Sequence, residues 1–137
     1  MLKDLAAKYY QQGYNCAETI IRAGNEYYNL ELDENAFRIT GAFGGGLQVG
    51  DVCGALTGSA CVVSAKYIET KAHDCPDLKP LMLKLVRAFQ TRFSSRLCAQ
   101  IKAKFHNKEV RCLNTVTLAA EVLEQVIAEY EQDKQSK

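Results

Sequence analysis

Cysteine is the residue type of this sequence best suited to chemistry, because a thiolate can attack a disulfide or bind a metal ion. The 137-residue chain contains six cysteines: Cys16, Cys53, Cys61, Cys75, Cys98 and Cys112. No two of them form a Cys-x-x-Cys pair, which excludes the local motifs of thioredoxin-like proteins, zinc ribbons and covalent c-type haem attachment. Any site built from these cysteines must therefore be assembled by the fold.

Three of the cysteines are predicted to lie at or near the start of a helix, namely Cys16, Cys53 and Cys112. A helix N-terminus presents free N–H groups and the positive end of the helix dipole, so it favours a thiolate over a thiol. Converging helix starts would form a pocket suited to reactive thiolates or to the negative charge of a thiolate-ligated cluster. The alternative is that the cysteines are small apolar packing residues, a common role of free cysteine.

Two other cysteines give weaker signals. Cys61 is flanked by small and β-branched residues on a predicted helix, and we interpret it as a packing residue. Cys75 lies with His73 in a predicted polar loop. It could be an exposed reactive thiol, or the two side chains could share a metal ion, and the sequence does not assign them a role.

The elements that position these cysteines are predicted to be helices, because apolar residues recur with a period near 3.6 along most of the chain. The clearest stripe predicts a helix from about Val110 to Tyr130. A second stripe, from Met82 to Phe105, predicts one long helix or two helices separated at Ser94-Ser95. The most basic stretch contains Lys102, Lys104, His106, Lys108 and Arg111. We interpret it as a solvated helix end and loop.

The first half of the chain contains residues typical of helix boundaries. Gly13 is predicted to end a first helix, and Asn15 is predicted to cap a second helix that carries Cys16 in its first turn. Asp33 is a candidate cap for a further short helix.

A glycine-rich segment from Gly41 to Gly50 follows. It lacks the Gly-Lys-Ser/Thr ending of a phosphate-binding loop, so we interpret it as a tight turn beside the cysteine pocket. Asp51 is a candidate cap for a helix that opens at Val52-Cys53, and the small residues of that helix suit the middle of a bundle. The sequence thus predicts an all-α fold, an irregular bundle of about five to seven helices with a central glycine-rich loop.

Length and composition indicate one helical domain over residues 1–137 and limit its partners. The formal net charge of +1 does not favour nucleic-acid binding, and no apolar run is long enough to span a membrane. The N-terminal segment contains Asp4, unlike a signal peptide, so we expect a cytoplasmic protein. Reducing conditions there make a structural disulfide framework a poor explanation of six cysteines.

Several motifs together resemble the C_GCAxxG_C_C family of redox-active proteins. They are Gly13-Tyr14-Asn15-Cys16-Ala17-Glu18, Phe43-Gly44-Gly45-Gly46, Cys53-Gly54-Ala55-Leu56-Thr57-Gly58, Phe93 with Cys98, and Cys112. The family name writes Gly-Cys-Ala where this chain reads Cys-Gly-Ala, a variant of the same element. The resemblance implies that Cys16, Cys53, Cys98 and Cys112 are the signature cysteines, and it implies a redox or electron-transfer role. Similar modules accompany split-Soret cytochromes, where an iron-sulfur centre is thought to be bound.

Three functions follow, in the order in which the sequence favours them. The first is electron transfer by an iron-sulfur or zinc centre ligated by the four signature cysteines; no covalent haem is expected. The second is thiol-disulfide exchange, with Cys16 and Cys53 as the expected attacking thiols. The third is a non-catalytic helical interaction module. The redox partner protein is unknown, and tyrosines such as Tyr9, Tyr10, Tyr27 and Tyr28 could serve the core or a homo-oligomer surface.

Overall fold

The computed structural model describes residues 1–136 and contains seven α-helices in that part of the chain. They are α1 (Leu2–Gln11), α2 (Cys16–Tyr28), α3 (Glu34–Ile39), α4 (Gly54–Tyr67), α5 (Leu78–Phe93), α6 (Cys98–Phe105) and α7 (Leu113–Gln135). Residues 1–136 contain no β-strand, only two isolated bridges. The predicted all-α bundle is confirmed.

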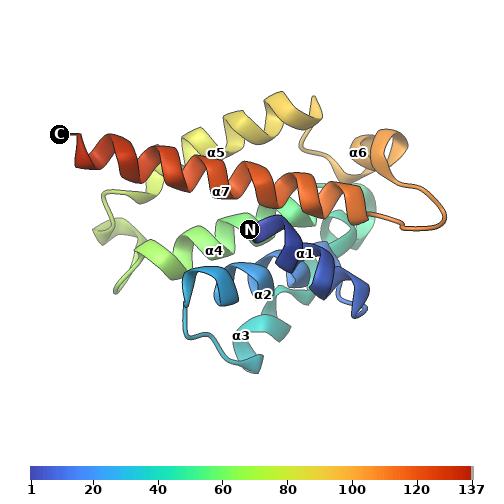
Figure 1. The fold of residues 1–137 in the computed structure, drawn as a ribbon, viewed down its shortest axis with the longest axis horizontal. Coiled ribbons are helices and arrows are strands. Elements are labelled where there is room, and N and C mark those ends of the chain that lie inside the picture. The colour runs from blue at the N-terminus through green and yellow to red at the C-terminus, as the bar shows by residue number, and fades with distance from the viewer. Residues whose placement is uncertain (137) are drawn as a thin grey trace.

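Helix α7 is the longest element and lies across the bundle, with α1 and α5 packed along it (Figure 1). The apolar stripe of α7 is buried against the apolar faces of α1 and α5. The side chains that are almost fully inaccessible are Leu2 and Ala6 of α1, Leu85 and Phe89 of α5, and Leu123 of α7. Burying such a side chain contributes roughly 1.5–3 kcal/mol, so this three-helix contact is a main source of stability.

Helices α2 and α4 form a second close pair, because α4 carries glycines where the two backbones meet. A Cβ atom at Gly58 would lie 2.9 Å from the carbonyl oxygen of Ala17, and one at Gly54 would lie 3.3 Å from the Ala17 nitrogen. Only glycine permits this approach. The predicted central position of the small-residue helix is therefore confirmed, and the start of α4 lies beside the start of α2.

The predicted boundaries of the first helices are confirmed by their caps. Gly13 has φ +100° just after α1, a conformation that favours glycine. Asn15 and Glu18 form a reciprocal capping box on α2, and the Asp33 side chain accepts a hydrogen bond from the Ala36 N–H at the start of α3.

The stripe from Met82 to Phe105 is divided at the predicted Ser94-Ser95 break, because Ser94 adopts a left-handed conformation (φ 59°) and ends α5 at Phe93. Two other predicted boundaries need correction. The last helix begins at Leu113 and not near Val110, since a turn precedes it. Asp51 does not cap α4, which begins at Gly54.

None of the helices in residues 1–136 combines the length and the apolar character needed to cross a bilayer.

Candidate functional site

All four signature cysteines lie at helix N-termini. Cys16 and Cys98 are the first residues of α2 and α6, whereas Cys53 and Cys112 immediately precede α4 and α7. Three of these positions were predicted from the sequence, and that of Cys98 was not. The ends of α1 and α6, the beginning of α7 and the glycine-rich segment gather at one end of the bundle (Figure 1).

The start of α2 is fixed by Asn15, which forms hydrogen bonds both with Glu18 in the first turn of the helix and with the glycine-rich segment. Its side-chain oxygen accepts from the Glu18 N–H at 3.1 Å, and its own N–H donates to the Glu18 carboxylate at 3.0 Å. Its side-chain amide also donates to the Gly41 carbonyl at 2.9 Å. The glycine-rich segment is thereby tied to the helix start that carries Cys16.

The starts of α4 and α6 are held together by backbone pairing. Val52 and Leu97 form an antiparallel bridge, in which the Cys53 N–H donates to the Arg96 carbonyl at 2.7 Å. The Cys98 N–H donates to the Asp51 carbonyl at 2.6 Å. This pairing explains why Asp51 is not a side-chain cap: its backbone is part of the bridge that brings Cys53 and Cys98 close together.

Gly46 permits the close approach of the glycine-rich segment to this bridge. A Cβ atom at Gly46 would lie 2.6 Å from the Asp51 nitrogen and 2.6 Å from the Cys98 Cβ atom. Residues Gly45, Gly46, Leu47 and Gln48 all have φ between 57° and 65°. The predicted tight turn beside the cysteine pocket is thus present as a left-handed turn against Cys98.

The start of α7 is positioned by a short loop and by Tyr10 of α1. Asn107 and Arg111 exchange two backbone hydrogen bonds, and the Asn107 side chain accepts from the Glu109 and Val110 N–H groups. The backbone N–H of Cys112, the residue after Arg111, donates a hydrogen bond to the Tyr10 hydroxyl at 3.0 Å. Tyr10 therefore connects α1 to the cysteine end of the bundle.

A cavity of about 430 Å³ opens at this end, and three of the four cysteines, Cys16, Cys98 and Cys112, line it. Cys53 does not line the cavity; it is buried in the adjoining core. It is nevertheless close enough for charge interactions with the other three sulfur atoms to affect their ionisation. The structure brings the four together, with three facing the cavity.

The four thiols differ in ionisation. A side-chain hydrogen bond from Cys16 lowers the pKa of Cys112 to about 6, and the positive charges of His106 and Lys102 and a hydrogen bond from Tyr10 add to this effect against the cost of burial. The same hydrogen bond and burial raise the pKa of Cys16 well above its ordinary value. Burial raises the pKa of Cys53 to about 11 and also raises that of Cys98.

Cys112 is thus the one thiol of the group whose pKa is lowered, and the pKa of its neighbour Cys16 is raised. The expectation that Cys16 and Cys53 are the attacking thiols is not supported, because their hydrogen bonding and burial outweigh the helix N-termini. A low-pKa thiolate hydrogen-bonded to a second thiol is the arrangement that disulfide exchange requires.

All six cysteines are free thiols in this structure. Within residues 1–136, no three or more His, Cys, Asp or Glu side chains are grouped so that they could hold a metal ion. The His73 and Cys75 pair likewise gives no such group; both line a separate hollow beside α5.

Cys61 was interpreted as a packing residue, but it is only half-buried. It lines an apolar hollow between α2, α3 and α4, apart from the signature cysteines.

Sequence reasoning missed several residues of the site. Lys102, His106 and Arg111 are exposed, as the interpretation of a solvated stretch predicted, but they also line the cysteine cavity. Lys102 follows Cys98 by four positions, a spacing that places both on one face of α6 and could have revealed it. Tyr10 gave no comparable signal, because its partner Cys112 is 102 positions away.

Comparison with known proteins agrees with the spacing of the cysteines. Residues 14–126, which include all four signature cysteines, match the model of the family described as "Putative redox-active protein (C_GCAxxG_C_C)". No curated protein and no solved structure matches the chain.

Proposed function

The chain belongs to the C_GCAxxG_C_C family of redox-active proteins, and from this premise we propose that it is a thiol-disulfide exchange protein. Cys112 is the attacking residue and Cys16 the resolving residue. The observation that carries the proposal is that Cys16 and Cys112 line one cavity as neighbours, with the pKa of Cys112 lowered and that of Cys16 raised by their interaction.

In the first step the Cys112 thiolate attacks one sulfur atom of a substrate disulfide. The substrate S–S bond breaks, a mixed disulfide forms at Cys112, and one substrate thiolate leaves and takes a proton from water. The helix N-terminus at Cys112 and the Tyr10 hydroxyl stabilise the attacking thiolate before this step.

In the second step Cys16 attacks the Cys112 sulfur atom. The Cys16–Cys112 disulfide forms, the mixed disulfide breaks, and the second substrate thiolate leaves with the proton of Cys16. The substrate gains two electrons as two thiols, and the protein loses two electrons as one disulfide. Cys16 lines the same cavity as Cys112, so it can reach the mixed disulfide.

Cys53 and Cys98 have supporting positions in this proposal. Cys53 is buried, and burial raises the pKa of both thiols, so they remain protonated at neutral pH. Their backbone N–H groups join the starts of α4 and α6. We expect them to position the cavity wall and to react more slowly than Cys112.

The experiment exposes the fully reduced protein to one equivalent of bis(2-hydroxyethyl) disulfide, blocks remaining thiols with iodoacetamide, and locates the modified cysteines by mass spectrometry. We expect a Cys16–Cys112 disulfide that dithiothreitol reverses. Cys16→Ser should accumulate the mixed disulfide at Cys112, and Cys112→Ser should lose the fast reaction. Cys61→Ser is the matched control, since Cys61 is half-buried on α4 and lines a different hollow.

Two results would contradict the proposal. One is a mixed disulfide that forms first on another cysteine, and the other is a reduced protein that does not react faster than an ordinary thiol. If substitution of all four signature cysteines by serine also left stability and partner binding unchanged, the non-catalytic interaction module would be the better description.

A thiolate-ligated iron-sulfur or zinc centre is the second candidate, favoured by the four cysteines at converging helix N-termini. It ranks second because their placement gives no group suited to a metal ion. Iron, sulfide and zinc analysis of protein purified without oxygen tests it. Stoichiometric metal that Cys98→Ser abolishes would favour this centre over disulfide exchange.

A further inference from the structure

The cysteine cavity carries an excess of positive charge in its wall. Lys102, His106 and Arg111 line it, and the one acidic residue among its lining residues is Glu18. The Glu18 carboxylate accepts the Asn15 N–H at 3.0 Å and belongs to the cap of α2. The chain as a whole has a formal net charge of only +1, so this local excess differs from the average surface.

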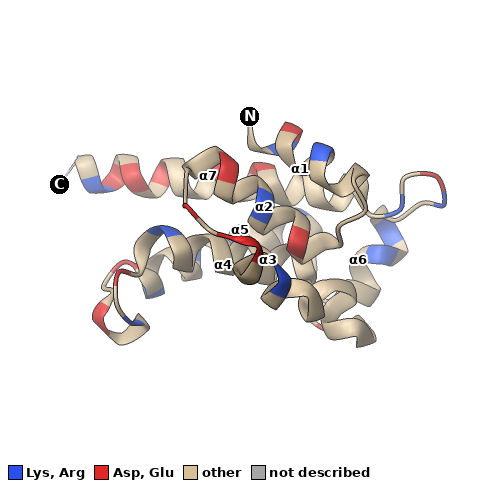
Figure 2. Cartoon of the chain, turned by 90° about the horizontal axis from the view of Figure 1, so that it is seen from below, with Lys and Arg blue, Asp and Glu red and all other residues tan. Residues whose placement is uncertain are grey.

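These cations are not neutralised by neighbouring carboxylates. Within residues 1–136, none of the ion pairs involves Lys102, His106 or Arg111, although other lysines of the chain are paired. Figure 2 shows basic residues on α6 and both basic and acidic residues in the adjoining loop, while acidic residues gather along the C-terminal half of α7. Arg111 has a different partner, since its guanidinium lies 5.5 Å from the centre of the Tyr10 ring.

The same backbone elements that position the cysteines also position the cations. Lys102 lies one helical turn after Cys98 on α6. Arg111 is held in a left-handed conformation (φ 53°) by its two backbone hydrogen bonds to Asn107, directly before Cys112. Lys102 and Arg111 are therefore each adjacent, in helical turn or in sequence, to a signature cysteine, and both line the cavity that those cysteines share.

The cavity wall carries more positive charge than is needed to stabilise the Cys112 thiolate. That thiolate has one negative charge, whereas Lys102 and Arg111 are two permanent cations. The surplus remains available to a ligand, and a cavity of about 430 Å³ is within the usual range for a small-molecule site.

We propose that the cavity selects low-molecular-weight disulfides that carry a carboxylate near the reacting sulfur atom. This inference rests on the proposed function and names its substrate class. Lys102 and Arg111 bind the carboxylate and place the disulfide at Cys112. The reaction is the two-step exchange described above, with the anionic disulfide as the oxidant and two anionic thiols as its products.

The test compares three symmetric disulfides that differ in charge: 3,3′-dithiodipropionate (anionic), bis(2-hydroxyethyl) disulfide (neutral) and cystamine (cationic). Each rate with the protein is divided by the rate with 2-mercaptoethanol, which removes the intrinsic reactivity of the probe. We expect the anionic probe to exceed the neutral one by about tenfold at low salt and the cationic probe to be slowest. The preference should decrease steeply as ionic strength rises.

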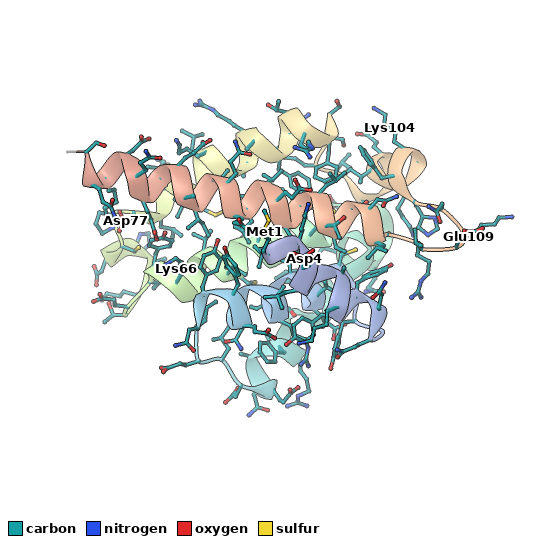
Figure 3. The ribbon with its side chains drawn as sticks, viewed as in Figure 1. Met1, Asp4, Lys66, Asp77, Lys104 and Glu109 are labelled. Carbon is teal, nitrogen blue, oxygen red and sulfur yellow. The ribbon has the colours of Figure 1, made fainter. Side chains whose placement is uncertain are left out.

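Variants assign the preference to the cavity wall. Lys102→Gln and Arg111→Asn should each reduce the anionic-to-cationic rate ratio about threefold, and asparagine tolerates the left-handed conformation at 111. The ratio is the proper readout, because a change in the pKa of Cys112 alters all three rates together. Lys104→Gln is the matched control: it removes the same charge from α6, but Lys104 extends outward from the bundle (Figure 3) and does not line the cavity.

The outcomes separate the two proposals. Exchange at Cys112 without charge preference, or an equal loss of preference in Lys104→Gln, would overturn this inference and leave the proposed function standing. Absence of rapid exchange with all three probes would remove the proposed function and this inference with it. Circular dichroism of each variant, with the Cys112 alkylation rate, shows whether an altered ratio comes from a loss of folding.

Discussion

The two ends of the bundle differ in how their polar side chains are partnered. Where α4 and α5 meet the C-terminal half of α7, two acidic residues each contact two neighbours. Figure 3 labels one of them, Asp77, and also Lys66. Glu131 accepts from the Tyr67 hydroxyl at 2.6 Å and contacts the Lys66 ammonium at 3.1 Å. Asp77 accepts from the Tyr130 hydroxyl at 2.7 Å and from the Lys134 ammonium at 2.9 Å.

At the cysteine end, the charged groups that line the cavity lack such partners. The side chains of Lys102, His106 and Arg111 form no ion pair within residues 1–136, and the Cys112 thiolate has only hydrogen bonds from neutral groups. The backbone there also adopts less common conformations, with positive φ at Leu47, Gln48 and Arg111. Such groups and strain persist where the surrounding structure fixes them, and they are typical of functional sites.

Stability and reactivity are therefore concentrated at different ends of the same bundle. Paired polar groups hold α7 onto α4 and α5 at one end. Unpaired cations and a thiolate at the other end give up stabilising interactions and are available for chemistry. Substitutions at the cysteine end should therefore change both stability and thiol reactivity, whereas substitutions at the paired end should change stability alone.

The largest effect is expected for Gly46→Ala at the cysteine end. The added Cβ atom would lie 2.6 Å from both the Asp51 nitrogen and the Cys98 Cβ atom, and φ is +63°. Steric overlap and backbone strain together should lower the free energy of unfolding by about 3 kcal/mol, measured by urea denaturation. Cys98 should also become more accessible to iodoacetamide.

Gly13→Ala is the control for this substitution. Gly13 also has positive φ (+100°) and lines the same cavity, but a Cβ atom there would meet nothing within 4 Å. Its cost should be limited to backbone strain, about 1 kcal/mol. Equal losses in the two variants would mean that the contact between the left-handed turn and Cys98 does not support the site.

Much of the fold was predictable because its signals are local. Asn15 and Glu18 are three positions apart, and their capping box fixed the start of α2 and the place of Cys16. The apolar stripe of α7 likewise predicted its burial. The start of α6 was not predictable in the same way, since it depends on the bridge between Val52 and Leu97, which no local pattern indicates.

Which cysteines form the site was easier to predict from the sequence than which of them is a thiolate. The predicted helix starts favoured a thiolate at Cys16 and Cys53 as much as at Cys112. The actual order follows from a hydrogen bond between Cys16 and Cys112 and from the burial of Cys53, both of which arise only when distant segments pack. The basic stretch is exposed, as predicted, but periodicity does not reveal that its loop lies against the cavity.

A smaller effect is expected for Tyr10→Phe, which tests whether the few partners of Cys112 determine its reactivity. The change removes the hydroxyl that accepts the Cys112 N–H and donates to the thiolate, so the pKa of Cys112 should rise. Because a lowered pKa keeps the thiolate above about pH 6, alkylation by iodoacetamide should slow about threefold near pH 6 and not at all near pH 9. Stability should decrease by about 1 kcal/mol.

Tyr9→Phe provides the matched control on the same helix. The Tyr9 hydroxyl donates to Glu26 at 2.6 Å on the exposed surface, away from the cysteine cavity. This variant should leave the pH profile of alkylation unchanged. A profile that shifts equally in both variants would show that α1, and not the hydroxyl of Tyr10, sets the ionisation of Cys112.

The smallest effect is expected at the paired end, for Tyr130→Phe. The substitution keeps the ring, which packs edge-on against Tyr67, and removes only the hydrogen bond to Asp77. The free energy of unfolding should fall by about 0.5–1 kcal/mol at neutral pH, and Cys112 alkylation should not change.

The pH dependence of this small loss identifies its cause. The Tyr130 hydrogen bond, followed by that of Lys134, lowers the pKa of Asp77, so its contribution is present above the ordinary carboxyl pKa and is lost as pH falls through the lowered value. The difference in stability between the wild type and Tyr130→Phe should therefore shrink in acid. A difference that stays constant from neutral to strongly acidic pH would assign the loss to packing, and an altered Cys112 alkylation rate would show that the two ends are coupled through α7.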